Sequence, residues 1–205
     1  MMARLLIATT NSAKLAEYRL LLRGFPLDVV SLGEVDITEA PVENGASFAE
    51  NALIKARFYF ARARMPTLAD DGGLEIEALG GEPGVRSHRW LGEKGSDDKS
   101  LVKEVIRRMR GVESGRRTAR IKAAVALVYY HAGAVKERTA EAALDGIIAE
   151  SAHPSIRPGF PYRSVLFIPA LGRYVAELGE EAEATISQRR IALERLNQWL
   201  AELAV

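Results

Sequence analysis

Apolar positions along the chain follow two spacings, one typical of helices and one typical of strands. After an apolar run at 4–10, Leu15, Tyr18 and Leu22 recur at the spacing of one helix face, so the chain is expected to open with a strand, a turn and a helix at 14–23. The same patterns predict strands at 27–32, 67–70, 74–79, 117–130, 135–148 and 165–168, helices at 47–64, 99–110 and 186–203, and a short segment at 173–178.

The two longest apolar runs, at 117–130 and 135–148, are separated by a short stretch that contains Gly133, and together they predict a long hairpin. The order of strands and helices on either side predicts an α/β chain whose middle is a lobe built on that hairpin. Polar or proline-rich stretches at 92–98 and 150–161 are expected to be loops.

Composition narrows the function classes. The chain has 205 residues, of which 48% are hydrophobic, so it is long enough to bury a core as one domain or as two closely packed lobes. Its 28 Lys and Arg residues against 27 Asp and Glu residues leave a formal net charge of +1. A protein that coats nucleic acid or an anionic membrane needs a surplus of basic side chains. We therefore expect no polymeric nucleic acid and no membrane as partner, and any anion that binds should be small.

The absence of cysteine restricts the possible chemistry. It excludes disulfides, thiolate nucleophiles, iron–sulfur clusters and cysteine-ligated zinc. His88, His131 and His153 are scattered along the chain, so a metal would need oxygen ligands, which points to magnesium or manganese. The first apolar run is too short for a signal peptide, and no window approaches the roughly 20 apolar residues of a membrane span. A cytoplasmic location is expected.

Two candidate sites lie at the starts of predicted helices. Thr9, Asn11 and Lys14 surround the first strand-to-helix turn, where free N–H groups and a cation can cradle an anion. The alternative is that Asn11 caps the helix and Lys14 is solvated, and spacing alone favours this alternative. Ser47 and Glu50 have the spacing of a capping box, and Glu50 is equally well placed as a metal ligand or base.

The acidic pair Asp70 and Asp71 stands at the end of a buried strand. Adjacent carboxylates repel each other and are poor strand formers unless a cation lies nearby. Neighbouring strand residues point to opposite faces, so only one of the pair is expected to reach a given site. Gly72 and Gly73 would let a ligand approach the backbone closely. An acidic turn that begins a hairpin is the alternative.

Aromatic and basic side chains near the C-terminal third are further candidates. Phe160 and Tyr162 offer two rings in the proline-rich loop, as a platform for a flat base or as residues that pack the loop. Arg189, beside Gln188 at the start of the last predicted helix, could bind a phosphate in a bidentate manner or be solvated.

Taken together, these segments resemble the Ham1-like family of non-canonical purine NTP pyrophosphatases from about residue 4 to residue 196. The stretches that carry the resemblance, in matching order and spacing, are LLIATTNSAKLAEYRLLL, SFAENALIKAR, LADDGGLEIEALGGEPGVRSHRWLG, GFPYRSVLF and ISQRRIALERL. The resemblance implies an α/β fold with a long mixed central sheet flanked by helices. It also implies a single domain over 1–205, two lobes with the active-site cleft between them, and a homodimer.

The resemblance further implies a reaction and the residues that carry it. Thr9, Asn11 and Lys14 would bind a triphosphate, while Glu50 and Asp71 would handle Mg²⁺, or Mn²⁺, and the attacking water. The expected reaction is hydrolysis between the α and β phosphates to a nucleoside monophosphate and pyrophosphate. Physically it requires positioning, charge neutralisation and deprotonation of water.

Departures from the family pattern concern the base. The family's Phe-Gly-Tyr/Trp-Asp-Pro loop is replaced by the sequence FPYRS at 160–164, so an acceptor-only carboxylate becomes the donor-only Arg163. Arg163 would suit a base edge with two acceptors, or an extra anionic group. Phe160 and Tyr162 would flank the base, and Arg163 and Gln188 would read it.

Four further positions can be compared with the family pattern, and three of them differ from it. Glu183 replaces a lysine, Gln188 a histidine and Gly72 a serine, whereas Arg189 is retained to brace the base or the α-phosphate. An anion at Glu183 opposes a polyphosphate, so this side chain should turn to solvent or the ligand should carry less charge. We therefore expect a purine nucleoside triphosphate pyrophosphatase that acts on substrates of the ITP, dITP or XTP type, with altered base recognition. The alternatives are a hydrolase of a modified nucleoside monophosphate and a non-catalytic nucleotide-binding module.

Overall fold

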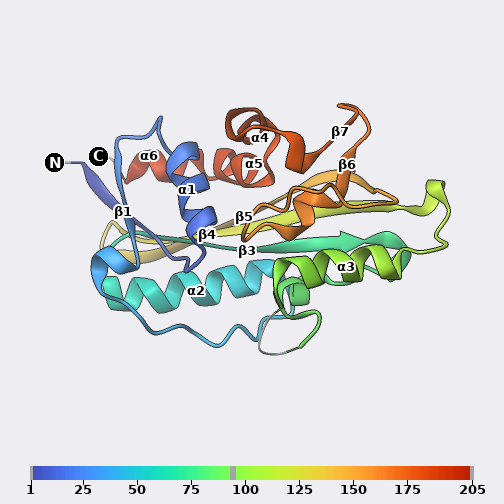
Figure 1. Cartoon of the computed structure of the whole chain (residues 1–205). Helices are drawn as coiled ribbons and strands as arrows, with labels where there is room; N and C mark the ends of the chain where they lie inside the picture. Colours follow the sequence, from blue (N-terminus) through green and yellow to red (C-terminus); the bar gives the residue numbers. More distant parts are fainter. Residues whose placement is uncertain (1, 93–95, 204–205) are drawn as a thin grey trace. The chain divides into compact units, whose positions relative to one another are not determined.

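A computed structural model describes residues 2–92 and 96–203 (Figure 1). Part of the loop expected at 92–98, residues 93–95, lies outside the described residues. The strands are β1 (Ala3–Ile7), β2 (Leu27–Ser31), β3 (Thr67–Ile76), β4 (Thr118–His131), β5 (Ala134–Ile148), β6 (Leu166–Ile168) and β7 (Arg173–Tyr174). The α-helices are α1 (Ser12–Leu21), α2 (Phe48–Ala63), α3 (Asp98–Arg108), α4 (Glu180–Ile186), α5 (Gln188–Arg195) and α6 (Asn197–Glu202).

The strands form one mixed sheet in the order β2-β1-β3-β4-β5-β6-β7. β1 runs parallel to β2 and to β3, with Leu5 opposite Val29 and Ile7 opposite Leu68. β6 pairs antiparallel with both β5 and β7. The predicted α/β class with a long mixed sheet is therefore confirmed.

The described chain divides into two compact units, each with its own apolar core. Unit 1 comprises residues 2–71, 123–142 and 188–203, and unit 2 comprises residues 72–122 and 143–187. In unit 1, Tyr18 of α1 and Leu193 of α5 pack with Leu5 and Leu127 of the sheet. In unit 2, Val105 of α3 packs with buried residues of β3 and β6. Within unit 1, α1 and α5 lie on one side of the sheet and α2 lies on the other (Figure 1).

Two boundaries differ from the sequence prediction. The strands expected at 67–70 and 74–79 are one continuous strand, β3, because each aspartate in the middle has a cationic partner on its own face. The helix expected at 186–203 is two helices, α5 and α6, separated by Leu196, and its first residue, Ile186, instead ends the preceding helix α4. No helix within 2–92 or 96–203 combines the length and apolar character that a membrane span requires.

Candidate functional site

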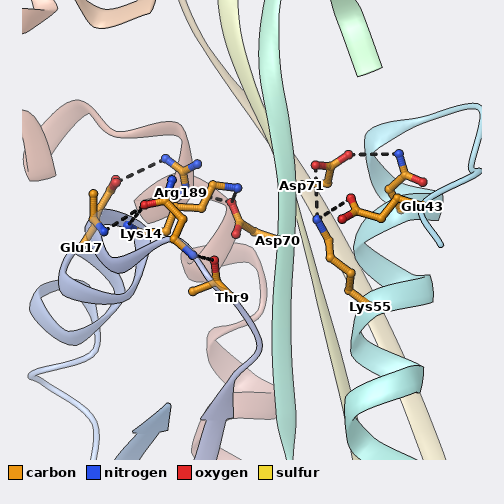
Figure 2. A network of polar contacts seen from close by, with 11 residues as sticks. Thr9, Lys14, Glu17, Glu43, Lys55, Asp70, Asp71 and Arg189 are labelled. Atoms are coloured by element: carbon orange, nitrogen blue, oxygen red, sulfur yellow. Dashed lines mark hydrogen bonds and ion pairs between the residues drawn. The ribbon is translucent and has the colours of Figure 1, made fainter. Parts of the chain in front are cut away.

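The two consecutive aspartates of β3 point to opposite faces of the strand, each toward a different set of side chains (Figure 2). Asp70 meets Lys14 of α1 and Arg189 of α5. Asp71 meets Asn51 and Lys55 of α2. The expectation that one aspartate of the pair faces a given site is confirmed, and the acidic-turn alternative is wrong.

Asp70 forms the centre of a buried cluster of charges. Its Oδ2 lies 3.0 Å from Lys14 Nζ and accepts a hydrogen bond of 3.0 Å from Arg189 Nε, while Arg189 Nη1 lies 3.3 Å from Glu17 Oε2. Asp70 is only 2% exposed. Burial alone would raise the pKa of Asp70, but the charges of Lys14 and Arg189 outweigh burial and lower it far below its ordinary value.

The helix start at α1 explains how Lys14 reaches this cluster. Asn11 caps the helix, because its Oδ1 accepts from the N–H groups of Ala13 at 2.9 Å and Lys14 at 3.2 Å, and Thr9 Oγ1 accepts from Asn11 N at 3.2 Å. The capping alternative for Asn11 is therefore confirmed, while the triphosphate roles of Thr9 and Asn11 stay predictions. Lys14 is buried against Asp70 and is not solvated. Arg189 is likewise buried.

Asp71 is held from α2 by two side chains one helical turn apart. Asn51 Nδ2 donates to Asp71 Oδ2 at 3.2 Å, and Lys55 Nζ lies 3.3 Å from Asp71 Oδ1 and 2.8 Å from Glu43 Oε2. Burial opposes the charged form of Lys55, yet the carboxylates of Asp71 and Glu43 raise its pKa above the ordinary value. Lys55 therefore stays an ammonium ion that bridges two carboxylates.

Sequence reasoning did not single out Asn51, Lys55 or Glu43. For the first two a signal existed, because residues four apart on a helix share a face, and that face carries an amide and a cation in an otherwise apolar pattern. No local pattern marked Glu43, since it lies in an irregular stretch before α2 and reaches Lys55 only through the tertiary fold.

Glu50 occupies the first turn of α2 and is exposed. Ser47 Oγ accepts from Glu50 N at 3.2 Å, and the Glu50 carboxylate accepts from Ala46 N at 2.8 Å. The first contact is one half of the capping box that the sequence allowed, while the Glu50 carboxylate accepts from Ala46, the residue before the Ser47 cap. The acidic side chain that meets Lys55 beside Asp71 is Glu43.

The oxygen donors near Asp71 fit a magnesium ion. Among residues 2–92 and 96–203, no group of three or more His, Asp or Glu side chains is arranged to hold a metal. Mg²⁺ does not require such a cage, because it keeps several waters and is usually bound by one or two carboxylates plus substrate phosphates. Asp71 and Glu43 supply carboxylate oxygens, the kind of donor that Mg²⁺ takes, and both already lie beside a cation, Lys55.

In unit 2 the two candidate rings behave differently. Tyr162 is buried in the apolar core, its hydroxyl donates to the Ser87 carbonyl oxygen at 2.6 Å, and burial raises its pKa. The packing alternative therefore describes Tyr162. Phe160 is half-buried, and the Arg163 guanidinium lies 3.5 Å from the centre of its ring.

Arg163 and Glu183, two positions whose charge departs from the family pattern, form an ion pair with each other. Arg163 Nη2 lies 2.5 Å from Glu183 Oε1, and Arg157 Nη1 lies 2.7 Å from Glu183 Oε2. Glu183 thus points inward, so the first alternative, that it turns to solvent, is wrong, because two guanidinium groups compensate its charge. The second alternative, a ligand of lower charge, stays a prediction. Gly72 is buried within β3 and Gln188 is buried at the start of α5, and their substrate roles stay predictions.

Comparison with known proteins gives consistent matches over nearly the whole chain. The model of the Ham1 family matches residues 5–199. A dITP/XTP pyrophosphatase of Geobacillus kaustophilus is 39% identical over 97% of this chain and 95% of that protein. A dITP/XTP pyrophosphatase of Symbiobacterium thermophilum is 41% identical over 98% of this chain and 96% of that protein.

Solved structures agree with these matches. The structure of a HAM1 protein from Coxiella burnetii has a TM-score of 0.83 at 32% identity and covers 98% of this chain and 100% of that chain. The Staphylococcus aureus Ham1 protein has a TM-score of 0.80 at 26% identity, covering 97% of this chain and 98% of that one.

Proposed function

Because the chain belongs to the Ham1 family, we propose that it hydrolyses non-canonical purine nucleoside triphosphates of the dITP and XTP type to the monophosphate and pyrophosphate. The observation that carries this proposal is the Asp71 cluster, in which a buried carboxylate is held by Asn51 and faces a bridging ammonium ion. Such an arrangement provides a base and a cation side by side, which phosphoanhydride hydrolysis requires.

Unit 1 carries the phosphate chemistry in this proposal. Lys14 offsets phosphate charge at the start of α1, where the helix N-terminus also favours anions. Thr9 and Asn11 support that turn, and Arg189 braces the α-phosphate or the base. Lys14 and Arg189 share Asp70 as counterion, so both are held in place before a ligand binds.

Asp71 orients and deprotonates the attacking water. Asn51 donates to one carboxylate oxygen of Asp71, and Lys55 donates to the other. When bound, Mg²⁺ or Mn²⁺ would offset phosphate charge and polarise the scissile linkage. We propose Asp71 and Glu43 as its protein donors, with Glu50 as the alternative that follows from the sequence.

A matched pair of variants tests whether Glu43 or Glu50 is the magnesium donor. Glu43→Gln is expected to raise the Mg²⁺ concentration for half-maximal activity by roughly tenfold, because it removes one oxygen anion beside Lys55 and Asp71. Glu50→Gln is expected to leave that concentration unchanged. A magnesium titration of pyrophosphate release measures both, and the reverse pattern would assign the metal to Glu50.

A nucleotide panel tests the proposed function itself. The protein is incubated with Mg²⁺ and the mono-, di- and triphosphates of inosine, deoxyinosine, xanthosine, guanosine and adenosine, and both pyrophosphate and phosphate are measured. Pyrophosphate release from ITP, dITP or XTP is the expected result. Turnover restricted to monophosphates would support a nucleotidase instead, and nucleotide binding without turnover would support a non-catalytic module.

The remaining proposals concern base recognition and assembly. Phe160 offers a ring to the base, and Gln188 reads its edge, with Tyr162 and Arg163 supporting the loop from within unit 2. We also propose a cytoplasmic homodimer without polymeric nucleic acid or membrane as partner. Light scattering during gel filtration tests the dimer.

A further inference from the structure

Arg157, which no motif singled out, lies in unit 2 in the loop before the 3-10 turn Pro161–Ser164. Its Nη1 lies 2.7 Å from Glu183 Oε2, and its Nη2 donates to the carbonyl oxygen of Leu178 at 3.1 Å. An acceptor on each terminal nitrogen fixes the plane of the guanidinium group. Arg157 is therefore oriented before any ligand binds.

The two arginines that share Glu183 differ in how far a ligand can reach them. The side chain of Arg163 is 7% exposed and lies over the Phe160 ring, whereas that of Arg157 is 28% exposed. Arg163 is thus a positioning residue that supports Phe160 from within the unit. Arg157 is therefore the arginine of this cluster whose side chain is more open to solvent, and hence to a ligand.

The chemistry of Arg157 restricts what it can recognise. A guanidinium group carries five N–H donors and no acceptor, and Glu183 and Leu178 engage one donor on each terminal nitrogen. Both oxygens of Glu183 already accept from arginines. The cluster therefore favours an oxygen acceptor on a ligand and disfavours an amino group, whose own N–H donors would face those of Arg157.

We propose that Arg157 donates to the second exocyclic oxygen of a 2,6-dioxopurine, so that the enzyme prefers XTP to ITP. The proposal rests on the proposed function and narrows its substrate. Xanthine carries an oxygen at C2, hypoxanthine has only a hydrogen there, and guanine has an amino group. A donor that one base satisfies and another leaves without an acceptor favours the first base by about tenfold.

The test compares kcat/KM for XTP and ITP in the wild type and in Arg157→Gln. The wild type is expected to favour XTP by about tenfold, and the variant is expected to lose that preference through a higher KM for XTP with kcat retained. Arg173→Gln is the matched control, because it makes the same change at an exposed position of the same unit. It should leave the ratio unchanged.

A binding measurement keeps this inference separate from the proposed activity. Calorimetry with the products XMP and IMP should show tighter binding of XMP to the wild type, and equal binding of both to Arg157→Gln. Equal kcat/KM for XTP and ITP in the wild type, or an equal loss for both in the variant, would overturn the inference while the proposed function stands. Absence of turnover with every nucleotide would contradict the proposed function, and XMP binding would still decide the role of Arg157.

Discussion

Replacing Asp71 with asparagine is expected to lower pyrophosphate release by about 10³-fold, with the loss in kcat rather than in KM. The amide keeps the shape of the side chain but cannot take a proton from water, and general bases contribute about 10²–10⁴-fold to enzyme rates. A steady-state assay with XTP and ITP at saturating Mg²⁺ measures the effect.

The control for this variant is Asp28→Asn, the same change at an exposed aspartate of unit 1 that pairs with Arg4. It should retain wild-type kcat. Circular dichroism and chemical denaturation of Asp71→Asn verify that the fold is kept. A folded Asp71→Asn protein with full activity would refute the assignment of Asp71 as the base.

Replacing Asp70, the residue before Asp71, has a different expected outcome. Asp70→Asn should lower the free energy of unfolding by about 3–5 kcal/mol at neutral pH, because it leaves the buried cations Lys14 and Arg189 without their common counterion. Urea unfolding of the two asparagine variants measures this contrast. Equal stability of Asp70→Asn and wild type would show that the buried cluster contributes nothing to folding.

The pH dependence of stability provides a second measurement on Asp70. Its pKa is lower in the folded chain than the ordinary value of 3.8, so the unfolded chain binds the proton first as the pH falls. The stabilisation is therefore complete above the unfolded pKa and is lost as the pH falls below it toward the folded pKa. The difference in unfolding free energy between wild type and Asp70→Asn should shrink on acidification.

The sequence predicted those parts of the fold that local patterns determine. Helix α2 was predicted within one residue of each end, since Ser47 caps its start and the apolar spacing continues to its last turn. The strands β1, β2 and β4 followed from their apolar runs in the same way. The period-2 rule also predicted correctly that Asp70 and Asp71 would face different surroundings.

The remaining features depend on partners that are distant in sequence. Nothing near Asp70 indicated that Lys14 and Arg189 would compensate its charge and allow β3 to continue through the acidic pair. Likewise, no local signal indicated that Arg163 and Glu183 would pair, because the two residues lie twenty positions apart in the sequence. The sequence also left open whether Tyr162 stacks on a ligand or packs the loop. Only the hydrogen bond from its hydroxyl to Ser87 reveals the packing role.

Because Asp70 and Asp71 point to opposite faces of β3, the site depends on the number of residues that precede them in the strand. Deleting a single residue between Thr67 and Asp70 would rotate every following side chain to the other face, if the start of the strand stays paired with β1. Asp71 would then meet the two buried cations and Asp70 would leave them. Gly72 would take the place that Asp71 holds opposite Asn51 and Lys55, so the shortened strand would keep a counterion for the buried cations and lose the proposed base.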